Sequence, residues 1–304
     1  MKPGWHKYLI YISLLFLVVA LYKLQYLEFP RIYSPVSMAL SIVCLFGGFV
    51  VNTIAQQRLL EQANYPVNIR EALAMVGLYV FGKYIPGKVW MVMGKAMYIA
   101  EKKNYPVTDL SLLFVHAQII GLWCGLTLGI CGLWVNDALH FISWVGLIVL
   151  SVFSLVLFSK TAHNAALNLI NRVLNKDFSL PVIDISKAIA LVPWFLLGWL
   201  LWGSGFLLLT LSITDHIVPI STVFCFPLAG TLGILFVLAP GGIGIREGII
   251  TGYLTLLTIS LPEAITISAV SRLWFLFGEL FIFIVGYLAS RKDNPNLSER
   301  QNNK

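Results

Sequence analysis

Charged side chains are scarce in this chain: they make up only 12% of its 304 residues, whereas 58% are hydrophobic. Soluble domains carry about 25% charged residues, so a soluble fold of this length would be short of the polar coat that it needs. The mean hydropathy of +0.83 points the same way. The composition therefore excludes a soluble globular protein and predicts a chain that spans a lipid bilayer several times.

Signatures of catalysis, metal binding and nucleotide use are equally sparse. We find no G-x-S-x-G nucleophile motif, no H-E-x-x-H zinc motif, no Asp-x-Asp pair and no ATP-binding motif. The five histidines are scattered, and the four cysteines lie inside apolar runs without a C-x-x-C pair. We therefore expect no metal, no cofactor and no catalytic residues, with a membrane-embedded polyprenyl-phosphate transferase left open as an alternative.

The excess of basic residues, with a formal net charge of +7, does not indicate a nucleic-acid partner here. The basic side chains lie mostly in short loops between apolar runs, where they orient a protein in the membrane and attract anionic headgroups. Most fall in loops that we assign to the cytoplasm, whereas Lys23 and Arg31 fall on the opposite side. This bias predicts cytoplasmic N- and C-termini and an even number of crossings.

Six apolar segments are long enough, or nearly so, to cross a hydrocarbon core of roughly 30 Å as helices. The first is read as a retained span rather than a signal peptide, because bulky residues stand where a cleavage site needs small ones. We group 1–290 into one membrane domain, with a cytoplasmic interfacial helix at about 160–176 and a disordered cytoplasmic tail at 291–304. The six segments are 8–24, 35–54, 109–135, 138–158, 188–213 and 264–289.

Two further apolar segments, 71–100 and 217–259, are interrupted by proline and glycine. Proline removes a backbone donor and glycine permits a sharp turn, so each segment predicts a helical hairpin that dips into the membrane and returns. The expected fold is all-α and polytopic, with about six spanning helices and two re-entrant hairpins of opposite orientation. Eight spans are the alternative, because 217–259 also fits two crossings. Broken helices that enter from opposite faces are typical of transporters with a site near the midplane.

Charges at these two breaks predict an anion site. Lys83 and Lys88 flank the first break, and Arg246 follows the second, where its planar guanidinium suits phosphate. Each break precedes a helix N-terminus, whose free amides and dipole attract anions. Arg272 and Glu279 share one face of the last span and need partners in the protein interior. Snorkelling lysines, a structural turn and plain ion pairs are the alternatives to a ligand site.

The two motifs, Lys83-Tyr84-Ile85-Pro86-Gly87-Lys88 and Pro240-Gly241-Gly242-Ile243-Gly244-Ile245-Arg246-Glu247, resemble the signatures of the lysylphosphatidylglycerol synthase transmembrane-region family, also called the flippase-like domain family. The resemblance covers essentially the whole chain and implies a bacterial or archaeal inner-membrane domain that moves lipids between leaflets. Synthase members carry a large soluble domain after the membrane part. Here only the polar segment 291–304 follows, so we do not expect synthase activity. The resemblance maps the family's lipid-handling hairpins onto Lys83, Pro86, Gly87, Lys88, Pro240, Gly241, Gly242, Gly244, Arg246 and Glu247.

To this headgroup site we add Tyr84, with Arg272 and Glu279 as supporting charges. The expected function is translocation of a phosphate-bearing lipid for the synthesis of envelope lipids or lipid-linked glycans. The expected partners are membrane lipids with an anionic headgroup. A lipid-modifying enzyme, a glycosyltransferase and a second copy of the chain are further candidates. A non-transporting accessory or regulator of an envelope enzyme is the alternative function.

Overall fold

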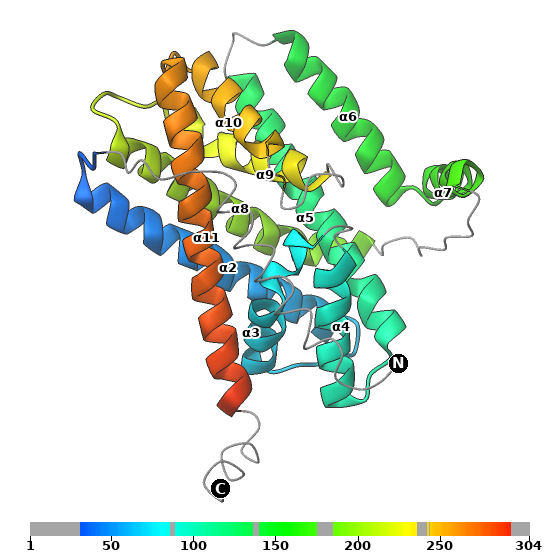
Figure 1. The fold of residues 1–304 in the computed structure, drawn as a ribbon. Helices are drawn as coiled ribbons and strands as arrows, with labels where there is room; N and C mark the ends of the chain where they lie inside the picture. The colour runs from blue at the N-terminus through cyan, green and yellow to red at the C-terminus, as the bar shows by residue number, and fades with distance from the viewer. Residues whose placement is uncertain are drawn as a thin grey trace, which may run out of the picture.

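The computed structural model describes residues 31–85, 89–135, 140–174, 185–235, 242 and 244–292. Within these ranges the chain forms ten α-helices and two short 3₁₀ helices and contains no strand. Figure 1 shows a bundle in which the last helix, α11, runs from one end of the molecule to the other. The expected all-α class is thus confirmed.

Among the described residues, five helices are long and apolar enough to cross a membrane. They match five of the six spans expected from the sequence, and α11 extends a few residues beyond the expected bounds at both ends. The remaining expected span, 8–24, lies outside the described residues. The chain is therefore a multi-pass membrane protein. The five helices are α2 (Pro35–Gln62), α5 (Val107–Val135), α6 (His140–Phe158), α8 (Ile185–Ile213) and α11 (Leu261–Lys292).

Local sequence explains where the first described helices begin. Proline starts α2, where its missing N–H needs no partner, and Ser34 caps the helix by accepting from the Ser37 N–H at 3.3 Å. α3 (Ile69–Leu78) starts with a capping box: the Asn68 side chain accepts from the Glu71 N–H, and the Glu71 side chain accepts from the Asn68 N–H, both at 2.8 Å.

The four helices of the two interrupted segments are too short to cross the hydrocarbon core alone. α3 has 10 residues, α4 (Val89–Lys103) 15, α9 (Cys225–Leu235) 11 and α10 (Ile245–Leu256) 12. At about 1.5 Å per residue, none of them reaches the roughly 30 Å of the core. Each interrupted segment also contains a 3₁₀ helix that the sequence did not reveal, namely η1 (Val80–Tyr84) after α3 and η3 (Ile220–Phe224) before α9.

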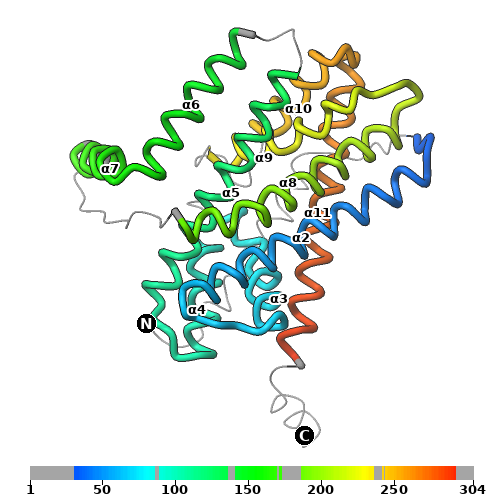
Figure 2. Tube along the Cα trace, turned by 180° about the vertical axis from the view of Figure 1, so that it is seen from behind, coloured from blue at the N-terminus to red at the C-terminus, as the bar shows by residue number. Residues whose placement is uncertain are grey.

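The two pairs of short helices lie at opposite ends of the bundle. Figure 1 shows α3 beside the C-terminal half of α11 and α10 beside its N-terminal half, with α4 next to α3 and α9 next to α10. Seen from behind, α2 and α8 lie side by side (Figure 2). They are antiparallel, because the Tyr33 N–H just before α2 donates to the Ser212 carbonyl near the end of α8 at 2.8 Å. α5 contacts both α4 and α9, so α5 and α11 connect the two ends.

An aromatic cluster fills the middle of the apolar core. Phe275 of α11 is at its centre, with the ring centroids of Phe49 and Phe226 at 5.2 Å and that of Trp202 at 5.5 Å. These rings come from α2, α9 and α8. Tilted and edge-on contacts of this kind add to the stabilisation that burial gives. The cluster therefore holds four helices together where the two pairs of short helices approach each other.

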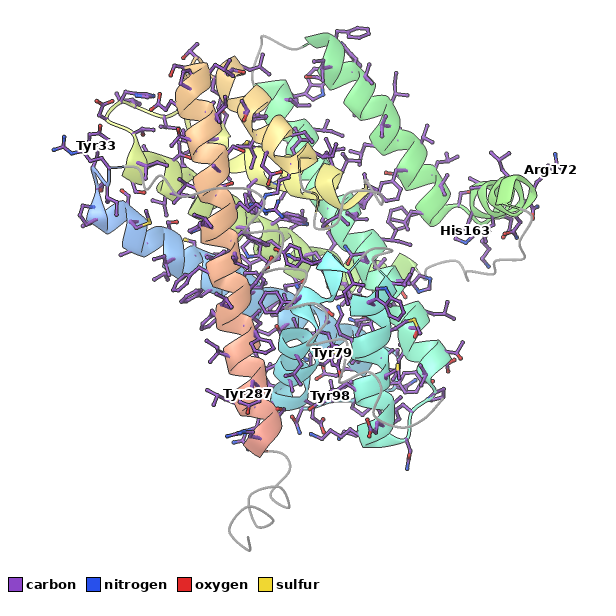
Figure 3. All side chains as sticks on the ribbon, viewed as in Figure 1. Tyr33, Tyr79, Tyr98, His163, Arg172 and Tyr287 are labelled. Carbon is purple, nitrogen blue, oxygen red and sulfur yellow. The ribbon has the colours of Figure 1, made fainter. Side chains whose placement is uncertain are left out.

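α6 and α7 (Lys160–Leu174) lie at the outer edge of this bundle, where α6 packs against α5 (Figure 3). α6 exposes large apolar side chains such as Phe141 and Ile148, as a lipid-facing helix would. α7 leaves α6 at a sharp angle, and Figure 3 shows Arg172 on its outer side. Its place in the membrane interface stays a prediction, and residues 293–304 of the expected tail lie outside the described ranges.

Tyrosines mark both ends of the bundle. Figure 3 shows Tyr33 near one end and Tyr287 near the other. The guanidinium carbon of Arg31 lies 5.5 Å from the Tyr33 ring centroid, and that of Arg291 lies 4.8 Å from the Tyr287 ring centroid. Tyrosine and arginine are typical of the membrane–water interface, so these pairs fit the two ends of a membrane-spanning body.

Candidate functional site

A buried carboxylate ties the first motif to α11. Glu279 has no exposed surface and accepts hydrogen bonds from Lys83 Nζ and, at 2.9 Å, from the Tyr84 hydroxyl. The Lys83 ammonium also lies 4.9 Å from the ring centroid of Phe275. The sequence predicted partners in the protein interior for Glu279 and Arg272, and the structure pairs Glu279 with Lys83 and Arg272 with Glu247. The positive charge of Lys83 is therefore neutralised within the protein.

A second carboxylate ties the other motif to the same helix. Glu247 Oε1 accepts from Arg272 Nη1 at 2.6 Å, and Glu247 Oε2 accepts from the Gly244 N–H at 2.6 Å. Gly244 has a φ of +84°, and Gly242 has a φ of +71°. Side-chain-bearing residues rarely adopt these values, so the backbone path into α10 requires glycine at both positions. The same path directs the first turn of α10 toward α11.

Arg246, next to Glu247, is buried and forms no ion pair with a carboxylate of the described residues. It is 8% exposed, and its Nη2 donates to the Ser271 carbonyl at 3.1 Å. Its guanidinium carbon lies 4.7 Å from the ring centroid of Phe226 and 5.0 Å from that of Phe275. Its Nε has no hydrogen-bond partner among the described residues. Stacking on two rings suits a guanidinium but leaves its positive charge uncompensated.

Lys95 on α4 is a second buried cation without a described carboxylate partner. It is 6% exposed, its Nζ donates to Gln56 Oε1 at 2.8 Å, and it lies 5.2 Å from the Phe114 ring centroid. Sequence analysis did not select this residue for the site. A signal was present, because a lysine within an otherwise apolar helix normally faces the protein interior or water.

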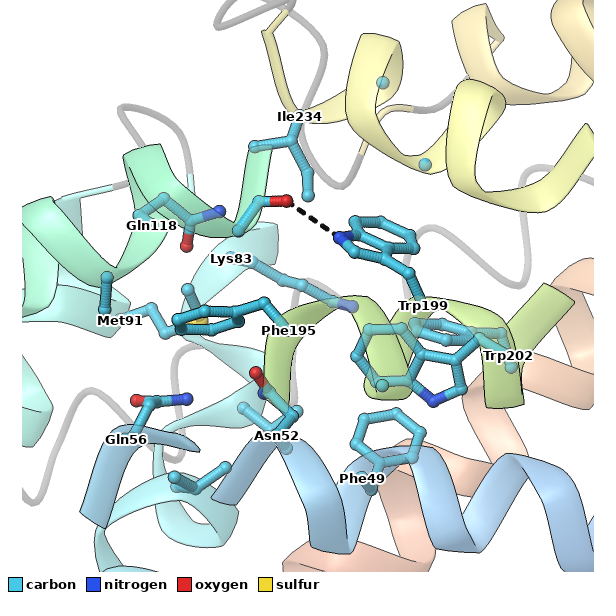
Figure 4. Close-up of a pocket in the computed structure, with 18 of the residues that line it drawn as sticks. Phe49, Asn52, Gln56, Lys83, Met91, Gln118, Phe195, Trp199, Trp202 and Ile234 are labelled. Carbon is cyan, nitrogen blue, oxygen red and sulfur yellow. Dashed lines mark hydrogen bonds between the residues drawn. The ribbon is translucent and has the colours of Figure 1, made fainter. Parts of the chain in front are cut away.

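These cations line one cavity of about 250 Å³ in the middle of the bundle (Figure 4). Residues of α2, α3, η1, α4, α5, α8, α9, α10 and α11 contribute to its wall. Lys83, Lys95 and Arg246 are the cations among the described lining residues, and no carboxylate is among them. Since Glu279 offsets Lys83, the described wall carries two uncompensated positive charges.

The neutral part of the wall combines amides with indoles. Figure 4 shows Gln118, Asn52 and Gln56 on one side of the cavity and Trp199 and Trp202 on the other. Trp199 Nε1 donates to a backbone carbonyl of α5 at 2.8 Å, which fixes the orientation of that ring. The two indoles meet edge to face, with centroids 5.4 Å apart. Sequence reasoning missed all five residues, because an apolar run does not reveal which aromatic side chains face a cavity and which face lipid.

The structure brings the described members of the predicted site to one region. Lys83, Gly242 and Arg246 line the cavity, while Tyr84, Glu247, Arg272 and Glu279 form the hydrogen bonds and ion pairs around it. Gly244 immediately precedes α10. The remaining predicted residues lie outside the described ranges, namely Pro86, Gly87, Lys88, Pro240 and Gly241.

This geometry defines a class: a multi-pass helical membrane protein with a cationic internal cavity between two pairs of short helices. Over residues 7–286 the sequence matches the family described as lysylphosphatidylglycerol synthase TM region. The chain belongs to this membrane-lipid-related family, which confirms the resemblance of its two motifs. Neither a comparison with curated proteins nor one with solved structures finds a match.

Proposed function

We propose that this protein moves a phosphate-bearing lipid between the leaflets of a membrane, with the headgroup passing through the central cavity. The observation that carries the proposal is the set of cations in the wall: three of them, without a carboxylate among the described lining residues. Family membership supports a lipid as the ligand, because the family is linked to membrane lipids.

The charge of the cavity supports an anionic ligand on energetic grounds. A buried ion costs several kcal/mol unless a counter-charge or good hydrogen bonds compensate it. Lys95 has one amide oxygen as its hydrogen-bond acceptor, and Arg246 has one backbone carbonyl and two aromatic faces. A phosphate in the cavity would bring a negative charge to the Arg246 guanidinium, which is part of the wall.

The size and position of the cavity support passage of a headgroup with its tails left in lipid. Sites that enclose whole small molecules have volumes of about 300–1,000 Å³, so about 250 Å³ suits a headgroup better than a complete lipid. The short helix pairs α3–α4 and α9–α10 approach the cavity from opposite ends of the bundle (Figure 1). Their lengths favour two re-entrant hairpins with six spans over eight full spans.

The sequence also supports a proposal for where the protein lies in the cell and for what drives transport. The bias of basic residues supports cytoplasmic termini, and the family resemblance supports the inner membrane of a bacterium or archaeon. With no ATP-binding motif in the sequence, transport is passive or coupled to an ion. We favour transport over catalysis, because the described wall offers cations and amides but no acid, base or nucleophile pair. An enzyme that modifies the lipid is the partner that this role would require.

The test is lipid movement in proteoliposomes that contain the purified chain. A fluorescent phosphatidylglycerol and a short-chain fluorescent polyprenyl phosphate are the probes, and a membrane-impermeant quencher reports which leaflet they occupy. The wild-type protein should expose more probe to the quencher over time than empty vesicles do. The double variant Lys95→Met/Arg246→Gln should lose this activity, because it removes both uncompensated charges while keeping similar side-chain volumes.

A matched control makes the same chemical changes outside the cavity. Lys187 and Arg70 are exposed, so Lys187→Met/Arg70→Gln should retain wild-type movement. Equal movement by the cavity variant and the control would refute the cavity as the route. Failure of the wild-type protein to move either probe would refute translocation by this chain alone and favour the accessory role, which co-purification with an envelope enzyme would then establish.

A further inference from the structure

If the proposed lipid translocation holds, the uncharged part of the cavity wall indicates more closely which headgroup the cavity binds. Phosphate alone would need only cations and backbone N–H groups. Part of the cavity wall is instead built from indole rings and carboxamide side chains (Figure 4). We infer that the cavity selects a lipid with a dianionic, diphosphate headgroup that carries an uncharged sugar, and that it rejects a cationic aminoacylated headgroup.

The charge balance of the wall supports the diphosphate. Glu279 neutralises Lys83, which leaves Lys95 and Arg246 uncompensated among the described residues. One phosphodiester carries a single negative charge and would leave one of these cations buried without a counter-charge. A diphosphate linkage carries two and matches both. The two cations come from different short helices, α4 and α10, and line the same cavity.

The amide side chains support a hydroxyl-rich neutral group beside the diphosphate. Asn52 and Gln118 line the cavity, and neither forms a hydrogen bond with another described residue. Gln56 uses its oxygen to accept from Lys95, so its amide donors remain available. A carboxamide offers two donors and one acceptor with two lone pairs, the set that neighbouring sugar hydroxyls can satisfy.

The indoles support a sugar ring rather than a small polar group such as glycerol. Trp199 is held by its hydrogen bond to α5, and Trp202 packs edge-on against it at 5.4 Å. Rigid aromatic faces bind the flat, apolar C–H face of a pyranose, whereas a flexible glycerol presents no such face. An aminoacylated headgroup would instead bring a primary ammonium into a wall with three cations and no described carboxylate. Like charges placed together are the usual basis for rejecting a wrong ligand.

The experiment measures binding and movement separately, with five lipids. Decaprenyl diphosphate and decaprenyl monophosphate glucose each differ from decaprenyl diphosphate glucose by one chemical group. Phosphatidylglycerol and lysylphosphatidylglycerol form a second matched pair. Binding to the full chain in nanodiscs is followed by quenching of tryptophan fluorescence and, independently of the indoles, by microscale thermophoresis. Movement is followed for fluorescent forms of the same lipids in proteoliposomes.

We expect decaprenyl diphosphate glucose to bind tightest. Removing the sugar or one phosphate should each weaken binding about tenfold or more, which corresponds to about 1.4 kcal/mol. Lysylphosphatidylglycerol should bind more weakly than phosphatidylglycerol. Asn52→Ala/Gln118→Ala should abolish the advantage of the sugar without weakening binding of decaprenyl diphosphate. The control Asn164→Ala/Asn168→Ala changes exposed amides on α7 and should preserve the advantage that the sugar gives in binding.

Two results would overturn the inference: equal affinity for the monophosphate and diphosphate sugars, or tighter binding of lysylphosphatidylglycerol than of phosphatidylglycerol. Failure of the proposed function is separable from these results. Selective binding of decaprenyl diphosphate glucose without any movement would support this headgroup and refute translocation. Movement of phosphatidylglycerol and decaprenyl diphosphate glucose at equal rates, with equal affinity for both, would support translocation and refute the selectivity.

Discussion

Replacing Glu279 with glutamine keeps the shape of the side chain but removes the charge that Lys83 faces. Glu279 is fully buried and accepts from both Lys83 Nζ and the Tyr84 hydroxyl, so η1 is held to α11 at this point. In Glu279→Gln the lysine is left with an amide in place of its counter-charge. Breaking a buried pair from one side costs about 3–5 kcal/mol, because the remaining charge stays away from water.

The free-energy cost of Glu279→Gln has an upper limit, which depends on how easily Lys83 can lose its charge. A stranded ammonium can release its proton, and from a reference lysine pKa of about 10.4 this costs about 4–5 kcal/mol at pH 7. Lys83 also faces the cavity, with 27% of its side chain exposed, so water there reduces the cost. We therefore expect Glu279→Gln to lower the free energy of unfolding by about 2–4 kcal/mol, below the full range for sealed pairs.

A double-mutant cycle separates the pair from the size of its side chains. Lys83→Met should also destabilise the protein, since it strands the carboxylate. Lys83→Met/Glu279→Gln should cost clearly less than the sum of the two single changes, with a coupling of about 1–3 kcal/mol. Unfolding in mixed detergent micelles, followed by tryptophan fluorescence, gives the three values, and the nine tryptophans supply the signal. Additivity within about 0.5 kcal/mol would refute the buried ion pair.

Two glycine substitutions test the packing and the backbone around the site. Gly77→Ala should destabilise the protein by about 1–3 kcal/mol, because a new Cβ would press on the backbone of α11 at Gly286. Gly252→Ala is the control: its new Cβ would enter open space and should change stability little. Thermal unfolding in detergent compares the two variants. Gly244→Ala should cost about 1–3 kcal/mol through its φ of +84° and should weaken diphosphate binding by displacing the first turn of α10. Gly248→Ala, in a helix with open space, is its control, and equal effects of the two changes would argue against the strained turn.

Much of the scaffold could be predicted from the sequence, since the length of an apolar run decides whether a helix can cross the membrane. The spans expected at 35–54 and 188–213 correspond to α2 and α8, although α2 ends eight residues later than expected and α8 begins three residues earlier. Glycine spacing correctly indicated a sharp turn before α10, where Gly242 and Gly244 have positive φ. The 3₁₀ helices η1 and η3 were not predictable, because tertiary packing rather than an apolar period produces these short turns.

The cavity was the least predictable part, because its members meet only in three dimensions. Lys83 and Glu279 are 196 residues apart, and Lys95 and Gln56 are 39 apart, so no local spacing links either pair. The chain could show that a buried lysine needs a partner, but the fold decides which lysines receive a carboxylate and which do not. That distinction is functional, because a cation already paired within the protein has little to gain from a ligand. Lys95, which sequence reasoning did not select, is therefore more informative about the ligand than Lys83, which it did.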